Sequence, residues 1–215
     1  MKRLALSFVL LASLALSPDA ARAGMITTTF ASNNAYTGNM FDVTTSGNAL
    51  TITGFDVNLD SVGTLIPISV YYRSGTYVGN ETSSAGWILA GTVNVISQGT
   101  DNMTFVNMAD FGIAGSSVTG LYVTVNVNSP PYMYYTNGSN TYSNADLTIN
   151  TGVGLGGLFG SLGVFNPRTW NGTIHYDLAP TNAVPAPAGL LLGLTGLPLV
   201  GIAGWVRRRR AAIGV

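Results

Sequence analysis

The sequence predicts an all-β domain, built as a two-sheet antiparallel β-sandwich or jelly roll and followed by a single C-terminal transmembrane helix. Three observations support this prediction. Apolar and polar residues alternate with a period of two along several short segments. Glycine, asparagine and serine turns separate these segments, and no stretch of ten residues within 24–178 has the spacing of an amphipathic helix. An uncharged apolar run of 19 residues, 188–206, is long enough to cross a bilayer as a helix.

Residues 1–23 have the features of a secretory signal peptide. A cationic Lys2–Arg3 pair precedes an apolar stretch at 4–16, and Ala21 and Ala23 are the small residues that a signal peptidase requires. We expect export by the Sec machinery, cleavage by signal peptidase after Ala23 and a mature chain that begins at Gly24. An uncleaved N-terminal anchor is the alternative, although an apolar stretch of 13 residues is short for a span.

The composition of the body, 24–178, limits the kinds of partner and the kinds of site that we expect. It carries Arg73 and Arg168 against eight carboxylates, a net charge of −6, so nucleic acid is not an expected partner. The chain has no cysteine, which excludes disulfides, thiolate metal sites and cysteine nucleophiles. A body of roughly 160 residues is the usual size of one domain with a full core.

Two segments in the first half of the body have strand periodicity. Within 50–59 the apolar positions change phase at Gly54, which is the effect of one extra residue in a β-bulge. Within 66–73 the alternation is regular, and Pro67 places this segment at a sheet edge or at a strand start because proline cannot donate to a ladder.

Two segments in the second half have the same periodicity. Apolar residues at 121, 123, 125 and 127 alternate with a tyrosine, a threonine and an asparagine, which predicts a strand buried on one face only. The segment 170–178 predicts one continuous strand with His175 facing outward. Further strands are expected at 26–30, 87–96, 103–107, 132–136 and 146–150. Eight or nine short strands without crossover helices favour two packed antiparallel sheets.

The C-terminal tail has three parts. A short linker, 179–187, ends in Val184, Pro185, Ala186 and Pro187. The apolar run 188–206 would rise about 28 Å as an α-helix, close to the ~30 Å hydrocarbon thickness of a bilayer, but Pro198 and five glycines make it a marginal span. The basic segment 207–215 should stay cytoplasmic because it begins with Arg207, Arg208, Arg209 and Arg210.

These three parts, together with the signal peptide, resemble the PEP-CTERM sorting tail of proteins from Gram-negative bacteria. The resemblance covers about 184–210. It implies an integral-membrane exosortase as partner, which recognises the tail and cuts near the proline motif, and hence an inner-membrane intermediate that passes to the cell surface or extracellular matrix. The family usually has glutamate between the two prolines, where this sequence has Ala186.

Tyrosines supply the candidate sugar-binding residues. Tyr132, Tyr134 and Tyr135 fall within four residues, and Tyr142 follows closely. Exposed rings beside asparagine and aspartate are how sandwich modules hold sugars, because the ring stacks on the sugar while polar groups bond its hydroxyls. Packing of these rings in the core or between strands is the alternative. A second group consists of Tyr71, Tyr72 and Tyr77.

Residues for catalysis or metal binding are few. His175 is the only histidine, and Asp56 with Asp60 is the candidate carboxylate pair of a hydrolase. The run 152–157 matches GxGxxG, but no helical pattern follows it, so we expect a flexible glycine-rich loop and no dinucleotide. We expect no cofactor; calcium held by Asp and Asn oxygens is the remaining option.

The sequence therefore predicts a non-enzymatic, exported protein of the cell surface or extracellular matrix, associated with adhesion, exopolysaccharide and biofilm. The exported N-terminus and the cytoplasmic arginines place 24–187 outside the cytoplasm, with the C-terminal helix in the membrane. Two alternatives stay open. One is an extracellular polysaccharide hydrolase that uses paired aspartates, and the other is an envelope protein that keeps its anchor permanently.

Overall fold

The computed structural model describes residues 22–125, 127 and 132–178. These residues form two antiparallel sheets and one 3-10 turn, so the all-β prediction is confirmed. No helix within the described residues is long and apolar enough to span a membrane. Most of the predicted signal peptide, the motif 184–187, the apolar run 188–206 and the arginine block lie outside the described residues.

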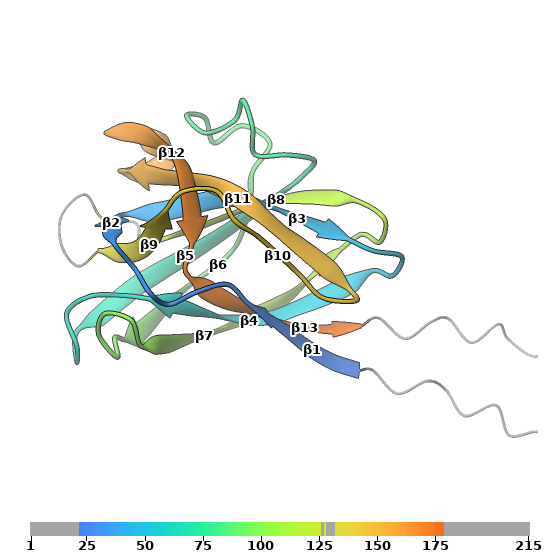
Figure 1. Cartoon of the computed structure of the whole chain (residues 1–215), viewed down its shortest axis with the longest axis horizontal. Helices are drawn as coiled ribbons and strands as arrows, with labels where there is room; N and C mark the ends of the chain where they lie inside the picture. Colours follow the sequence, from blue (N-terminus) through green and yellow to red (C-terminus); the bar gives the residue numbers. More distant parts are fainter. Residues whose placement is uncertain (1–21, 126, 128–131, 179–215) are drawn as a thin grey trace, which may run out of the picture. The chain divides into compact units, whose positions relative to one another are not determined.

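The smaller sheet has four strands, which in spatial order are β1 (Arg22–Thr27), β13 (Gly172–Leu178), β4 (Leu50–Asn58) and β7 (Met103–Ile113). Arg22 pairs with Leu178, so the start of β1 and the end of β13 leave the domain side by side (Figure 1). We call this end of the domain the tail end. The opposite end, where Asn58 pairs with Met103, is the distal end.

The larger sheet has nine strands. Eight of them follow in the order β2 (Asn34–Tyr36), β9 (Met133–Asn137), β12 (Gly163–Trp170), β11 (Leu147–Gly156), β3 (Gly38–Thr45), β8 (Val118–Thr124), β5 (Leu65–Ser74) and β6 (Ile88–Ile96). The ninth, β10 (Thr141–Ser143), also pairs with β11, and the turn η1 (Leu158–Gly160) lies between β11 and β12. The two sheets face each other across the core (Figure 1).

Trp170 lies in the main core between the sheets. Its ring stacks on Phe41 with centroids 4.6 Å apart and meets the edge of Phe55 at 6.2 Å. Gly172 leaves room for it, because a Cβ there would lie 2.1 Å from the Trp170 ring. The chain passes from the larger to the smaller sheet at Asn171, so the prediction of one continuous strand over 170–178 is wrong. The alternation continues through this crossing because the inner faces of both sheets meet the same core.

Two local predictions are confirmed. The register of β4 shifts between Ile52 and Gly54 against β7, with a matching irregularity against β13, as a β-bulge requires. Pro67 lies in the part of β5 that pairs only with β6, since β8 pairs with β5 from Ser69 onward. Pro67 therefore lies where β5 has only one neighbouring strand. On the side of β5 that faces away from β6, no ladder hydrogen bond from the backbone nitrogen is needed.

The strand predicted to be half-buried is buried on both faces. Tyr122 and Thr124 of β8 are 0 % exposed, because side chains from outside the sheet cover its outer face. Trp87 from the end of the β5–β6 connection and Phe159 of η1 pack against Tyr122, with ring centroids 6.2 Å and 5.2 Å from it. Burial raises the pKa of Tyr122 to about 12. These rings belong to a second, smaller core on the outer face of the larger sheet. The alternation of residues along β8 could not reveal this core.

Candidate functional site

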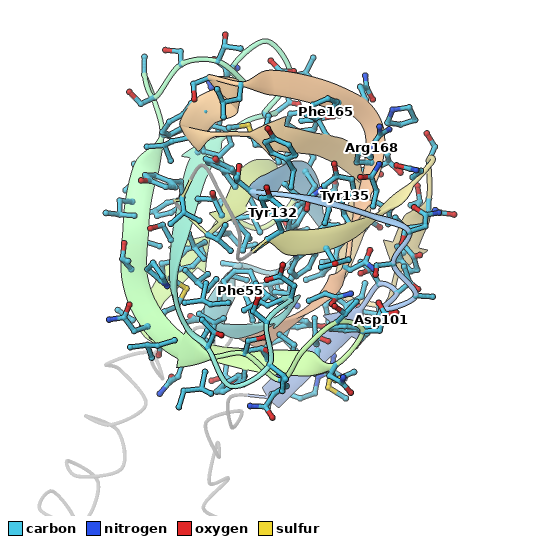
Figure 2. The ribbon with its side chains drawn as sticks, turned by 90° about the vertical axis from the view of Figure 1, so that its left-hand side faces the viewer. Phe55, Asp101, Tyr132, Tyr135, Phe165 and Arg168 are labelled. Atoms are coloured by element: carbon cyan, nitrogen blue, oxygen red, sulfur yellow. The ribbon has the colours of Figure 1, made fainter. Side chains whose placement is uncertain are left out.

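Aromatic side chains gather at the distal end of the domain. Tyr36 of β2 stacks on Tyr132, with ring centroids 5.8 Å apart and 14° between the planes. Phe165 of β12 tilts against Tyr36 at 5.6 Å. Tyr36, Tyr132 and Phe165 are each partly exposed, and we call them the distal ring cluster. Figure 2 views this end and labels Phe165 and Tyr132, with Tyr135 close by.

Two glycines of β11 lie beneath these rings. A Cβ at Gly154 would lie 2.8 Å from the ring of Tyr135, and a Cβ at Gly156 would lie 2.6 Å from the ring of Tyr36. Both glycines belong to the GxGxxG run, which is part of strand β11 up to Gly156. The prediction of a flexible loop there is wrong. The absent side chains let tyrosines of β2 and β9 lie against the β11 backbone, so this run has a packing role.

Arg168 covers Tyr135 at this end. The guanidinium carbon lies 5.9 Å from the centroid of the Tyr135 ring, and Nη1 donates a 2.8 Å hydrogen bond to the carbonyl of Pro167. Burial raises the pKa of Tyr135, while Arg168 acts in the opposite sense. Tyr135 is only 2 % exposed, so it supports the distal ring cluster from below and offers no ring face to a ligand.

Two aspartates hold the loops around the cluster. Asp60 Oδ1 accepts a 2.9 Å hydrogen bond from the backbone N–H of Tyr132. Asp101, labelled in Figure 2, accepts from the Ser32 hydroxyl at 2.6 Å and from Asn58 Nδ2 at 3.0 Å. The hydrogen bond from Ser32 is the main cause that lowers the pKa of Asp101. These two aspartates therefore join four connecting segments at the distal end: β4–β5 to β8–β9 through Asp60, and β6–β7 to β1–β2 through Asp101.

Asparagine side chains lie at the start of β2, just before it, and at the end of β9. Asn34 Nδ2 of β2 donates to Asn137 Oδ1 of β9 at 3.0 Å, and the Asn137 N–H donates to Asn33 Oδ1 at 2.8 Å. Asn33 and Asn137 are exposed. Amides supply both donors and acceptors, which are the groups that sugar hydroxyls bond.

The four predicted tyrosines do not form one surface. Tyr132 belongs to the distal ring cluster, whereas Tyr135 lies buried beneath it. Tyr134 directly precedes Tyr135 along β9 and therefore points to the face of that strand opposite to Tyr135. Tyr142 of β10 packs against the main core.

Sequence reasoning missed Tyr36 and Phe165. Each is an isolated aromatic residue in the sequence, so no local pattern marks it. Tyr36 meets Tyr132 because β2 pairs with β9, which begins one residue after Tyr132, and Phe165 of β12 joins the cluster through Tyr36. The nearest signal in the sequence is the pair Gly154 and Gly156, whose lack of side chains lets rings approach.

The second tyrosine group has a packing role. Tyr71 stacks on Tyr122 at 5.6 Å on the outer face of the larger sheet, and Tyr77 is 7 % exposed in the same small core. Tyr72 points to the other face, where it stacks on Phe111 at 4.7 Å. These rings are partners of one another and of the core.

His175 and Asp56 form a pair on the outer face of the smaller sheet. His175 Nε2 lies 2.8 Å from Asp56 Oδ2, and the ring of Phe105 meets the imidazole edge-on at 5.3 Å. The His175 side chain is 29 % exposed and faces outward, as predicted. Asp60 bonds the Tyr132 N–H instead, so the two predicted aspartates have different partners. Across the described ranges, no three His, Asp or Glu side chains gather as a metal site would require.

No family of known proteins and no curated protein matches this sequence. Among solved structures, the VP2 subviral particle of infectious bursal disease virus is similar at 14 % identity and a TM-score of 0.22, over 98 % of this chain and 60 % of that chain. The Gt strain of the same virus gives 13 % and 0.21, over 97 % and 60 %. The chain thus spans about three fifths of the length of these viral chains. The likeness is too low to carry an argument.

Proposed function

We propose that this protein is a non-enzymatic surface or extracellular-matrix protein, exported by a Gram-negative bacterium and sorted by a PEP-CTERM-like tail that an exosortase processes. Its sandwich contributes to adhesion or to exopolysaccharide association in a biofilm. The arrangement of the two ends carries this proposal. Arg22 pairs with Leu178 at the tail end, whereas the distal ring cluster lies at the opposite end.

The chemistry of the cluster suits a neutral or weakly charged sugar. Three partly exposed rings provide apolar faces for stacking, and the asparagines of β2 and β9 provide hydrogen-bonding groups. The stack of Tyr36 on Tyr132 and the hydrogen bond from Tyr132 to Asp60 hold the rings in place before a ligand arrives. Such preorganisation reduces the entropy lost on binding.

Tyr132→Ala is expected to weaken binding of the exported protein to exopolysaccharide about fivefold, since the contact of one ring contributes roughly 1 kcal/mol. Calorimetry or a pull-down with exopolysaccharide purified from the producing bacterium measures this. Phe165→Ala should behave in the same way. Phe105→Ala removes a ring that is 53 % exposed on the smaller sheet, and this control should bind like the unaltered protein. Equal binding by all of these proteins would count against a sugar site at the distal ring cluster.

Mass spectrometry of protein recovered from the cell surface is expected to find chains that end near 184–187 and lack Arg207 to Arg210. Deleting the exosortase gene should retain the protein in the inner-membrane fraction, because the uncut tail keeps its apolar run. Surface chains with the arginine block intact would instead indicate a permanent anchor and would defeat the processing proposal.

A further inference from the structure

Asp146 lies just before β11 of the larger sheet, at the tail end. Its carboxylate bonds two side chains of the smaller sheet, those of Arg22 and Tyr176. Arg22 Nη2 of β1 lies 2.9 Å from Asp146 Oδ1 and 2.7 Å from Oδ2. The Tyr176 hydroxyl of β13 donates to Asp146 Oδ2 at 2.9 Å and accepts from Asn144 Nδ2 at 2.8 Å. The Asp146 side chain is 13 % exposed, so its carboxylate is largely removed from water.

Gly24 lies directly beside this carboxylate site. It is the ladder partner of Tyr176, and a Cβ at Gly24 would lie 2.5 Å from the Tyr176 ring and 2.8 Å from its hydroxyl oxygen. The hydroxyl that a Cβ at Gly24 would meet is the one that bonds Asp146. Burial is the main cause that raises the pKa of Tyr176, and its hydrogen bond to Asp146 adds to the effect, so the phenol stays protonated as a donor.

Cleavage after Ala23 changes the charges at this place. The step rests on the export part of the proposed function. It removes Arg22 and leaves a new α-ammonium on Gly24, two residues further along the same strand. The other arginines of the body lie elsewhere, Arg73 over Trp87 and Arg168 over Tyr135. A nearly buried carboxylate without a cation is strongly unfavourable.

We propose that Asp146 is the binding site for the N-terminus of the mature protein. The α-ammonium of Gly24 takes the place of the Arg22 guanidinium and pairs with the Asp146 carboxylate. Signal-peptide cleavage therefore exchanges one cation for another and keeps β1 fastened to the β10–β11 turn. Asp146 from that turn and Tyr176 from β13 face the new N-terminus, whereas Asp177, the next residue of β13, points to the opposite face of the strand.

The sequence makes this N-terminus easy to observe. Lys2 is the only lysine of the chain and leaves with the signal peptide, so the α-amine is the only primary amine of the mature protein. The pH dependence of its reaction with an amine-specific reagent reports its pKa alone. An opposite charge nearby favours the ammonium form, so we expect a pKa above the ordinary value of about 8. In Asp146→Asn the pKa should return to about 8.

Asp177→Asn is the matched control. Asp177 pairs with Ala23 in the same ladder, but the carboxylate that bonds Arg22 is that of Asp146. This control should leave the pKa of the α-amine raised. Mass spectrometry first establishes the N-terminus of the exported protein. A start other than Gly24 would overturn the cleavage step on which the inference rests. A Gly24 start with the same α-amine pKa in the unaltered and Asp146→Asn proteins would overturn the docking alone.

The pH dependence of the stability of the folded protein provides a second test, and its direction follows from the raised pKa. A raised pKa in the folded protein means that the ion pair stabilises fully below the unfolded value of about 8, and that this contribution is lost as pH rises through the folded value. At pH 7, acetylation of the α-amine should lower the thermal midpoint of the unaltered protein and leave that of Asp146→Asn unchanged. An equal decrease in both proteins would contradict the pair.

Discussion

Trp170→Ala is expected to lower the free energy of unfolding by about 3–5 kcal/mol, the usual cost of deleting a large buried aromatic side chain. Trp170 is 1 % exposed and contacts Phe41 of the larger sheet and Phe55 of the smaller sheet. Its ring therefore fills space between both layers, and neither phenylalanine can fill the cavity without leaving its own strand. Urea denaturation followed by circular dichroism measures the loss.

Phe105→Ala serves as the control for Trp170→Ala. It also removes an aromatic ring, but one that is 53 % exposed, so the loss should stay below about 1 kcal/mol. Trp170→Phe keeps part of the ring contact and should fall between the two. A Trp170→Ala loss as small as that of Phe105→Ala would show that the two sheets do not depend on this contact.

Gly152→Ala is expected to destabilise the protein by about 3 kcal/mol, at the upper end of the range for overpacked positions. A Cβ at Gly152 would lie 1.7 Å from the carbonyl oxygen of Met40, a backbone atom of the neighbouring strand β3. The oxygen can yield only if β3 and β11 separate. The register of β11 shifts here against both β3 and β12, so the glycine lies in an irregularity that already brings the backbones close.

Gly112→Ala is the matched control for Gly152→Ala. Gly112 lies on β7, and no atom lies within 4 Å of the Cβ that alanine would add. Its substitution should change the free energy of unfolding by less than about 0.5 kcal/mol, or stabilise slightly by restricting the unfolded chain. Chemical denaturation of the two variants side by side measures the difference. Equal losses would mean that the contact with Met40 is not the cause.

Periodicity located β8 but predicted burial on one face only, and it missed β3 altogether, because both faces of these two strands are covered. The phase change at Gly54 was visible because outward residues of β4 remained polar on either side of it. Strand β3, Gly38–Thr45, was not predicted. Met40 and Phe41 are neighbours on opposite faces of β3, yet both are 0 % exposed, one in each core. A strand buried on both faces has no alternation to detect.

The candidate site shows the same limit. Clustering in the sequence drew attention to Tyr132, which does lie in the distal ring cluster. It also drew attention to Tyr135, which is buried in a strand that pairs with β2 on one side and with β12 on the other. Consecutive residues of a strand point to opposite faces, so Tyr134 and Tyr135 cannot belong to one stacking surface. The ring partner of Tyr132, Tyr36, lies 96 positions away in the sequence, and its hydrogen-bond partner Asp60 lies 72 positions away.

Properties that depend on local composition follow from the order of residues alone: the prediction of a signal peptide, the presence of the proline motif and the arginine block, the lack of cysteine and the alternation typical of strands. Contacts between distant segments had to come from the folded chain. They bring Tyr36 to Tyr132, lay two tyrosines on the glycines of β11, and place Asp146 beside Arg22. The physical reason is that periodicity tells which way a side chain points, whereas strand pairing and loop packing decide what it meets there.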